Sequence, residues 1–284
     1  MISDGAREAI RQAGFGEVLS AEQIEGGLIS QTMRISTKKR SVVVKQCEVA
    51  PPDLYAIEAD SLKFLRDHGG PRVPEAIAVG PTYLVLEDLG KGEPGPDFWE
   101  RFGREIAALH QNRADKFGFE SDTYLGLLKI DNKWSEDGHE FFARTRILRF
   151  LVEARASETL EKSDRVRVER LAARLKDLIP QQGPSLCHGD LWAGNMGATS
   201  GGEPFIIDPA LYYGWPEAEL SMTYAYEGVG PAFFESYMEV NPLEDGWKER
   251  LELLNIRELL SMIAHNGDQF GTLGRLRALL DKFA

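Results

Sequence analysis

The sequence predicts an α+β protein of two lobes, a small lobe with an antiparallel sheet and a larger, mainly helical lobe. Short apolar runs rich in β-branched residues, with one long amphipathic helix among them, fill the first part of the chain. Amphipathic helical patterns dominate the second part, and the glycine- and proline-rich stretch 90–96 separates the two. We therefore expect a small lobe over residues 1–90 and a large lobe over 91–284, each long enough to bury a core.

The expected elements of the small lobe follow from turn residues and periodicity. Gly26 and Gly27 lie between two strand-like runs, and the basic run 38–40 is typical of an exposed hairpin turn. The remaining elements are a helix over 4–12, strands over 41–44, 73–79 and 83–86, and a helix between Pro51-Pro52-Asp53 and Gly69-Gly70-Pro71.

Glu58 is an acidic residue on the apolar face of that second helix. It recurs with three leucines at spacings of three and four residues, so it faces the core. Because an unpaired buried carboxylate is costly, Glu58 needs a cation. Lys45, at the end of strand 41–44, is the expected partner, and the alternative is local pairing with Lys63 or Arg66 at helical spacing.

The large lobe is expected to begin with a helix over 98–110, preceded by the capping-box pattern of Asp97 and Glu100. His110 at its end is better explained as a hydrogen-bonded structural residue than as a catalytic one. The aromatic-rich stretch 115–135 either lines a sugar-binding cleft or packs a long connection over the lobe. The remaining elements are amphipathic helices over 138–160, 164–179, 242–265 and 274–283, a helix from Pro216, and short strands over 185–187, 196–198 and 204–207.

Two carboxylates and an amide lie at the ends of these short strands. They are Asp190, Asn195 five residues later, and Asp208 thirteen residues beyond. Phosphoryl transfer needs a carboxylate that orients the acceptor hydroxyl, and oxygen ligands for Mg²⁺ beside the phosphates. Asp190 suits the first role, and Asn195 with Asp208 suits the second. Each residue taken singly could instead be a turn or capping residue, so it is the joint pattern that favours chemistry.

Composition argues against several kinds of partner. The formal net charge is −12, from 33 basic and 45 acidic residues, which disfavours nucleic acid. No apolar run is long enough to cross a bilayer, and the first residues do not resemble a signal peptide, so we expect a cytoplasmic protein with no membrane partner. Cys47 and Cys187 are too few for a disulfide framework and fit a reducing compartment as inert core residues. The oligomeric state is not predicted.

The sequence around the acidic motif carries a wider resemblance. The segments HGDLWAGN, IIDPALYYGWPEAELSMTYAY, FFESYMEVNPL and HNGDQFG, with FGFESDTYLGLL, NKW and FFARTRIL upstream, resemble the fructosamine kinase (ketosamine-3-kinase) family over about residues 20–275. The resemblance implies a protein-kinase-like fold of the aminoglycoside-phosphotransferase type. It also implies transfer of the ATP γ-phosphoryl group to a sugar hydroxyl, at O3, of a free or protein-linked ketosamine in deglycation, with Mg²⁺ as cofactor.

The resemblance also assigns roles to individual residues. Asp190 is the base, Asn195 and Asp208 hold Mg²⁺, and Glu58 holds Lys45, which anchors the α- and β-phosphates. The other implied contacts are Gly26 and Gly27 near the triphosphate, backbone groups of Glu87, Asp88 and Leu89 at the adenine edge, and Trp192 and Glu217 at the acceptor.

Some positions and some functions stay open at this stage. Trp192 could equally be a packed core residue, and His265 lies in a family motif of unassigned role. The family usually has Asp where Glu219 stands beside the catalytic loop. One rival function is a kinase of the same fold acting on another small alcohol, such as an aminoglycoside, choline or a free sugar. The other is a nucleotide-binding protein without turnover.

Overall fold

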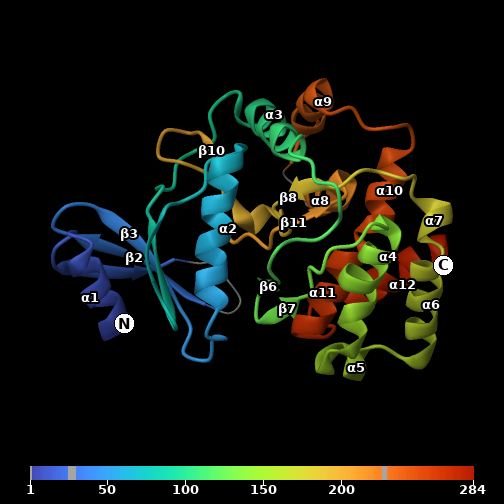
Figure 1. Ribbon diagram of the computed structural model, residues 1–284, viewed down its shortest axis with the longest axis horizontal. Coiled ribbons are helices and arrows are strands. Elements are labelled where there is room, and N and C mark those ends of the chain that lie inside the picture. The colour runs from blue at the N-terminus through green and yellow to red at the C-terminus, as the bar shows by residue number, and fades with distance from the viewer. Residues whose placement is uncertain (1, 25–29, 226–228) are drawn as a thin grey trace.

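The computed structural model describes residues 2–24, 30–225 and 229–284 and shows two lobes of α+β structure (Figure 1). The small lobe contains β1 (Val18–Gln23), β2 (Gln31–Thr37), β3 (Ser41–Gln46), β4 (Ala76–Gly80) and β5 (Tyr83–Glu87), with helices α1 (Asp4–Gln12) and α2 (Leu54–His68). The strands form one five-stranded antiparallel sheet in the order β1-β2-β3-β5-β4. Helix α2 lies between this sheet and the large lobe (Figure 1).

At the centre of the small-lobe sheet both faces carry buried hydrophobic side chains, because successive residues of a strand point to opposite faces and are apolar on both. On β5, Val85 belongs to the cluster that includes α1, whereas Leu84 and Leu86 belong to the cluster that includes α2. This arrangement confirms the small antiparallel sheet that was predicted. The strand expected from residue 73 begins at Ala76, and the turn at 38–40 joins β2 to β3. The residues Gly26 and Gly27 lie outside the described part of the chain.

The large lobe is mainly helical; β8 and β11 lie near its centre, whereas β6, β7 and β10 lie on the side that faces α2 (Figure 1). Its elements are α3 (Phe98–His110), β6 (Thr123–Leu125), β7 (Leu128–Ile130), α4 (Gly138–Phe142), η1 (Ala143–Ile147), η2 (Leu148–Val152), α5 (Ala154–Thr159), α6 (Lys162–Ala173), α7 (Leu175–Leu178), β8 (Ser185–Cys187), η3 (Ala193–Asn195), β9 (Met196–Ala198), β10 (Pro204–Ile206), β11 (Tyr212–Gly214), α8 (Pro216–Ala225), α9 (Pro231–Val240), α10 (Trp247–Leu254), α11 (Ile256–Asn266) and α12 (Thr272–Phe283). The strands pair as β6 with β7, β8 with β11, and β9 with β10, all antiparallel.

The prediction of one continuous helix over 138–160 is wrong. Helix α4 passes into the π-helical turn η1 and the 3-10 segment η2 before α5 begins. Within η1 the Arg146 guanidinium is buried, donates to Asn132 Oδ1 at 2.6 Å and lies 3.9 Å from the Tyr212 ring centroid. A buried guanidinium needs hydrogen-bond acceptors. The π turn lies where the Arg146 side chain reaches the Asn132 side-chain oxygen.

Three other helix predictions need correction. The helix expected over 164–179 is divided at Arg174 into α6 and α7. The helix expected over 242–265 is divided at Asn255, whose side chain donates to the Ser221 carbonyl at 3.3 Å. Asp97 precedes α3 as predicted, but its side chain accepts no capping hydrogen bond. Its backbone (φ −106°, ψ 21°) is not in the extended conformation from which a capping side chain reaches the first turn.

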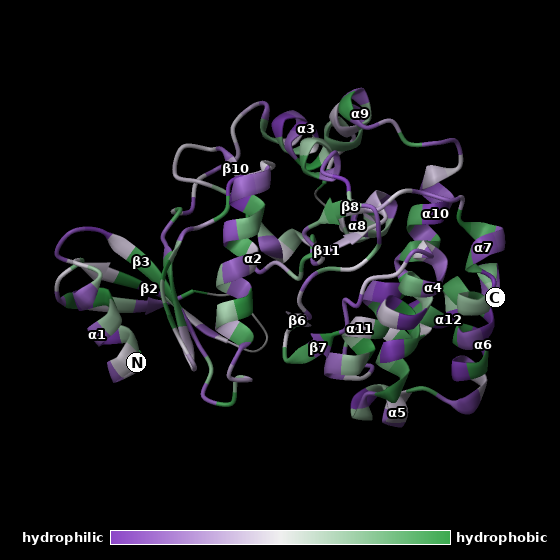
Figure 2. Ribbon diagram, viewed as in Figure 1, coloured by the Kyte–Doolittle hydropathy of each residue, from purple (hydrophilic) through white to green (hydrophobic). Residues whose placement is uncertain are grey.

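Hydrophobic residues gather in distinct clusters, and along the large-lobe helices they alternate with hydrophilic ones as amphipathic helices require (Figure 2). One cluster lies around α11 in the large lobe and another between α1 and the sheet. A further cluster joins Leu62 and Leu65 of α2 to Phe102 and Leu109 of α3 and to Leu186 of β8. This shared cluster crosses the lobe boundary near residue 90, which stays a prediction. In the described ranges no helix has the length and apolar character needed to cross a membrane.

Candidate active site

The β9–β10 hairpin brings Asn195 and Asp208 to the same end of two neighbouring strands. Met196 pairs with Ile206, and the Ile207 N–H donates to the Asn195 carbonyl at 3.1 Å. Asp208 follows directly with φ of 58°, in the left-handed region. That conformation costs a non-glycine residue about 1 kcal/mol and is typical of functional sites.

Asp190 lies beside Asn195 and is partly buried, with 20% of its side chain exposed. The Asn195 amide nitrogen donates to the Asp190 carbonyl at 2.8 Å and to its carboxylate at 2.9 Å. Both amide N–H groups are therefore committed to Asp190, so the amide presents its oxygen in the other direction. Burial raises the pKa of Asp190 to about 7, with smaller contributions from Glu258 and Asp208 against the opposing charge of Arg257.

Lys45 connects the small lobe to this hairpin. Its ammonium lies 2.6 Å from Glu58 Oε1 and 2.8 Å from Asp208 Oδ1. The predicted ion pair between Lys45 and Glu58 is confirmed, whereas Lys63, the local alternative, pairs with Asp67. Burial alone would lower the pKa of Lys45, but the carboxylates of Asp208 and Glu58 outweigh it and raise that pKa, so the ammonium stays charged.

Glu219 on α8 supports the loop that carries Asp190. Its carboxylate accepts the backbone N–H groups of His188 at 3.1 Å and Gly189 at 2.6 Å, and it bonds His110 Nε2 at 2.8 Å. Burial would raise the pKa of Glu219, but these hydrogen bonds, led by His110, hold it below its usual value. His110 also bonds the Tyr237 hydroxyl through Nδ1 at 2.7 Å, so it is the structural residue that was predicted.

Arg257 is a residue of the site that the sequence reasoning missed. It is buried, its Nη2 donates to the Gly189 carbonyl at 2.6 Å, and its Nη1 lies 3.7 Å from Asp190 Oδ1 and 3.1 Å from Glu258 Oε2. The signal that could have found it is the one that identified Glu58, a charged residue on the apolar face of an amphipathic helix.

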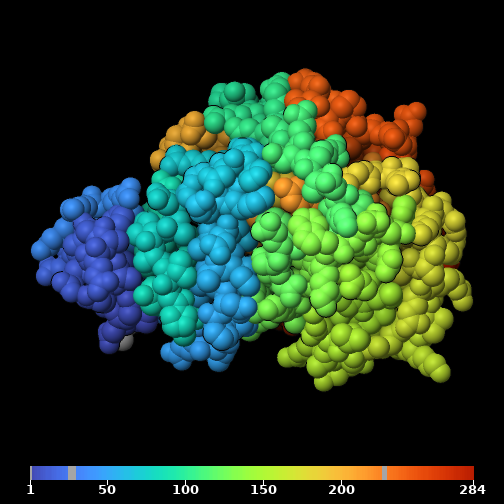
Figure 3. All heavy atoms as spheres, viewed as in Figure 1, coloured from blue at the N-terminus to red at the C-terminus, as the bar shows by residue number. Residues whose placement is uncertain are grey.

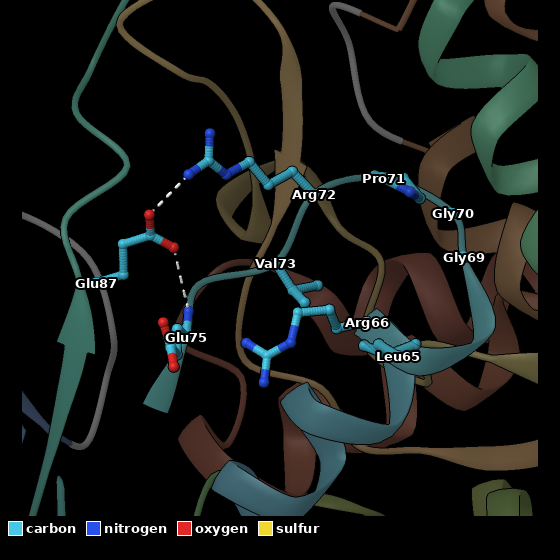
Figure 4. A pocket seen from close by; sticks show the side chains of 9 residues that line it. All are labelled: Leu65, Arg66, Gly69, Gly70, Pro71, Arg72, Val73, Glu75 and Glu87. Carbon is cyan, nitrogen blue, oxygen red and sulfur yellow. Dashed lines mark hydrogen bonds and ion pairs between the residues drawn. The ribbon is translucent and has the colours of Figure 1, made fainter. Parts of the chain in front are cut away.

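Glu87 ends β5 and uses its side chain for structure. Its carboxylate accepts Arg72 Nη2 at 2.7 Å and the Glu75 N–H at 3.3 Å (Figure 4). It lies on the wall of a cavity of about 440 Å³ lined by Leu65, Arg66, Gly69, Gly70, Pro71, Arg72, Val73, Glu75 and Glu87. Asp190, Asn195 and Asp208 do not line this cavity, so it is separate from the candidate active site.

Asp88 and Leu89, which follow Glu87 in the connection between the lobes, also make structural contacts. Asp88 accepts Arg34 Nε at 2.8 Å and the Gly90 N–H at 3.0 Å. The Leu89 carbonyl accepts the Ser200 N–H at 3.1 Å. The adenine role of this segment stays a prediction.

The two residues predicted to contact the acceptor differ in their surroundings. Trp192 is half-buried with its indole over Gly194, where an added Cβ would collide with the ring. Glu217 is buried, and its carboxylate accepts Arg250 Nε at 2.7 Å, Arg250 Nη2 at 2.6 Å and Gln182 Nε2 at 3.0 Å. These contacts favour a structural role for Glu217 over the predicted contact with substrate, while the role of Trp192 stays a prediction.

Comparisons with known proteins match nearly the whole chain. The family model described as Fructosamine kinase matches residues 1–281. A probable ketoamine kinase of Enterococcus faecium is 33% identical over 266 residues, covering 92% of this chain and 94% of that protein. The chloroplastic protein-ribulosamine 3-kinase of Oryza sativa subsp. japonica is 31% identical over 247 residues, covering 84% and 71%. The crystal structure of a putative fructosamine-3-kinase from Thermobifida fusca aligns with a TM-score of 0.87 at 29% identity, covering 99% of this chain and 100% of that one.

These matches extend over nearly the whole chain and confirm both the resemblance found in the sequence and the fold that it implied. The chain belongs to the fructosamine kinase family.

Proposed function

We propose that this protein transfers the γ-phosphoryl group of ATP to the O3 hydroxyl of a ketosamine. The observation that supports this most is the meeting of Lys45, Glu58 and Asp208 at the hairpin end that also holds Asn195, next to Asp190. This is the set of groups that phosphoryl transfer requires of a protein, a fixed cation, oxygen ligands for a metal and a carboxylate beside the acceptor. A nucleotide-binding protein without turnover would not need a carboxylate held beside Asn195 in this position.

The donor set fits Mg²⁺. Asp208 offers a carboxylate on a strained backbone, and Asn195 has its amide oxygen turned away from Asp190. Carboxylate and amide oxygens are the ligands that this hard cation prefers. Asn195 and Asp208 would hold Mg²⁺, whose chemistry when bound is to neutralise charge on the phosphates.

Asp190 would orient the acceptor hydroxyl and take its proton. The acceptor oxygen forms a bond to the γ-phosphorus, the bond to the ADP oxygen breaks, and the hydroxyl proton passes to the carboxylate. A base with a pKa of about 7 is well matched to this task near neutral pH. Lys45 would anchor the nucleotide phosphates from the small lobe.

The acceptor class rests on relatives. The Enterococcus relative has the name probable ketoamine kinase and the Oryza relative the name protein-ribulosamine 3-kinase, which supports a free or protein-linked ketosamine and attack from O3. A cytoplasmic location is proposed on the two cysteines, Cys47 and Cys187, which are free and buried.

The test is Mg²⁺-dependent ATP consumption with fructoselysine, ribuloselysine, a free ketose, choline and an aminoglycoside as separate acceptors. We expect turnover of the two ketosamines, NMR assignment of the product phosphate to O3, and loss of turnover in Asp190→Asn. Selective turnover of choline or the aminoglycoside would show that the proposed acceptor is wrong, whereas phosphoryl transfer to a hydroxyl would stand. Equal ATP consumption by wild type and Asp190→Asn would remove Asp190 from the mechanism.

A further inference from the structure

The residue before helix α2 does not cap its own helix. Asp53 occupies the N-cap position, where an aspartate normally accepts a first-turn N–H, yet its side chain makes no such bond. Instead Asp53 Oδ1 accepts the Tyr124 hydroxyl at 2.7 Å, and Oδ2 lies 3.4 Å from Lys129 Nζ. Both partners lie on the β6–β7 hairpin of the large lobe. The pair with Lys129 is half-exposed and so contributes little, which leaves the Tyr124 bond as the main contact.

The β6–β7 hairpin is itself held firmly. His265 on α11 bonds the Leu125 carbonyl through Nε2 at 3.0 Å. At the base of the hairpin the buried Asn132 amide nitrogen bonds Thr123 Oγ1 and the Leu211 carbonyl, each at 3.1 Å. Leu211 lies three residues after Asp208 in the chain. The hairpin therefore makes hydrogen bonds to α11 on one side and, through Asn132, to Leu211 in the segment after Asp208 on the other.

Helix α2 also contacts the large lobe further along its length. The ring of Phe64 packs edge-on against Phe119 with centroids 5.1 Å apart, and Asn112 Nδ2 donates to the His68 carbonyl at the helix end at 3.0 Å. Figure 3 shows the cyan atoms of α2 directly against the green atoms of the large lobe. With Asp53 at its start, α2 is docked on the large lobe from its first turn to its last.

The position of α2 determines whether Glu58 can reach Lys45. Glu58 lies five residues after Asp53, which is about 7.5 Å along a helix axis, so the first turn and Glu58 move together. The contact between Glu58 Oε1 and Lys45 Nζ is 2.6 Å, and a small shift of this turn would open it.

We propose that the β6–β7 hairpin is a strut that positions Glu58, and through it Lys45, from the large lobe. Tyr124 supplies its contact with α2, and His265 anchors it. These are positioning residues, since neither lies in the set of groups around Asp190 and Asp208. The inference rests on the proposed function only in giving Lys45 the nucleotide phosphates as its ligand.

The experiment measures MgATP affinity by isothermal titration calorimetry, without an acceptor, together with steady-state kinetics. Tyr124→Phe removes one hydroxyl and keeps the ring, and we expect MgATP affinity to fall about three- to tenfold, which is the effect of losing one ordinary, partly exposed hydrogen bond. The KM for the acceptor should stay within twofold. Asp53→Ala should match Tyr124→Phe, and Asp53→Asn, which keeps an oxygen acceptor, should restore most of the affinity. Lys63→Gln is the control, because its pair with Asp67 stays within α2.

The deciding comparison is the double variant Tyr124→Phe/Glu58→Gln. If the strut acts through Glu58, the double variant binds MgATP no more weakly than Glu58→Gln alone. Additive losses, or wild-type affinity in both Tyr124→Phe and His265→Gln, would overturn the proposal. The calorimetry needs no acceptor, so a wild type that binds MgATP but consumes none with any acceptor contradicts the proposed function and leaves the strut testable.

Discussion

Replacing Glu219 with glutamine should both destabilise the fold and lower kcat. Three groups surround this buried carboxylate, the N–H of Gly189 at Oε1 and the N–H of His188 with His110 Nε2 at Oε2. The Glu219 carboxylate can only accept, so His110 Nε2 is the donor toward it, and the Tyr237 hydroxyl, which accepts from Asn241, can donate to His110 Nδ1. A carboxylate offers only acceptors, whereas an amide must turn its NH₂ group toward at least one of these donors.

The size of the effect follows from the number of donors. A hydrogen bond to a charged group contributes about 1.5–3 kcal/mol, and a buried donor without a partner costs a similar amount. Glu219→Gln leaves one or two donors unmatched, so we expect a loss of about 3–5 kcal/mol in the free energy of unfolding. That is a large part of the 5–15 kcal/mol that is typical of a folded protein. Because two of the donors belong to the loop before Asp190, we also expect kcat to fall at least tenfold.

Glu219→Asp is the matched control, because it keeps both oxygens on a shorter side chain. We expect it to cost about 1–2 kcal/mol, as stretched hydrogen bonds would. The assay is urea unfolding followed by tryptophan fluorescence, with ATP consumption measured on the same preparations. A Glu219→Gln protein within about 0.5 kcal/mol of wild type would refute the reasoning. Equal losses in both variants would assign the effect to packing instead of to the acceptors.

Further predictions concern the groups around Asp190. Asp190→Asn should keep nucleotide affinity and lose on the order of a hundredfold in kcat; a smaller loss counts against its role as base. Because burial raises the pKa of Asp190 to about 7, kcat/KM should fall tenfold per pH unit below that value, and a flat profile down to pH 5 contradicts this. A carboxyl whose pKa is higher in the folded chain destabilises the fold above that pKa, so Asp190→Asn should raise the unfolding midpoint at pH 8 more than at pH 5. Arg257→Lys keeps the charge but loses the fork that reaches both Gly189 and Asp190, so kcat should drop about tenfold with MgATP affinity unchanged, as steady-state kinetics and calorimetry would show. Asp208→Ala should abolish the Mg²⁺ dependence of ATP affinity in calorimetry; equal wild-type affinity with and without Mg²⁺ argues against this ligand.

Some parts of the site could be predicted because their cause is local in the chain. Asn195 and Asp208 lie on either side of a short hairpin, so strand pairing alone brings them to one end. Glu58 was predicted to need a cation because helical periodicity places it on an apolar face, and Lys45 is at the end of a neighbouring strand. The same reasoning applied to α11 would have marked Arg257 as buried, but not what it contacts.

The sequence by itself determined the two-lobed α+β architecture, the small antiparallel sheet and the residue types of the β9–β10 hairpin, because periodicity and turn residues act over a few positions. Only the tertiary structure decided that Arg257 contacts the Gly189 carbonyl from 68 residues away. The same is true of the ion pair between Glu217 and Arg250 and of the hydrogen bond from Tyr124 of the large lobe to Asp53 at the start of α2. Periodicity shows which face of a helix is buried. What that face meets depends on how every helix in the lobe packs, and a π turn such as the one at Arg146 changes that packing without a local signal.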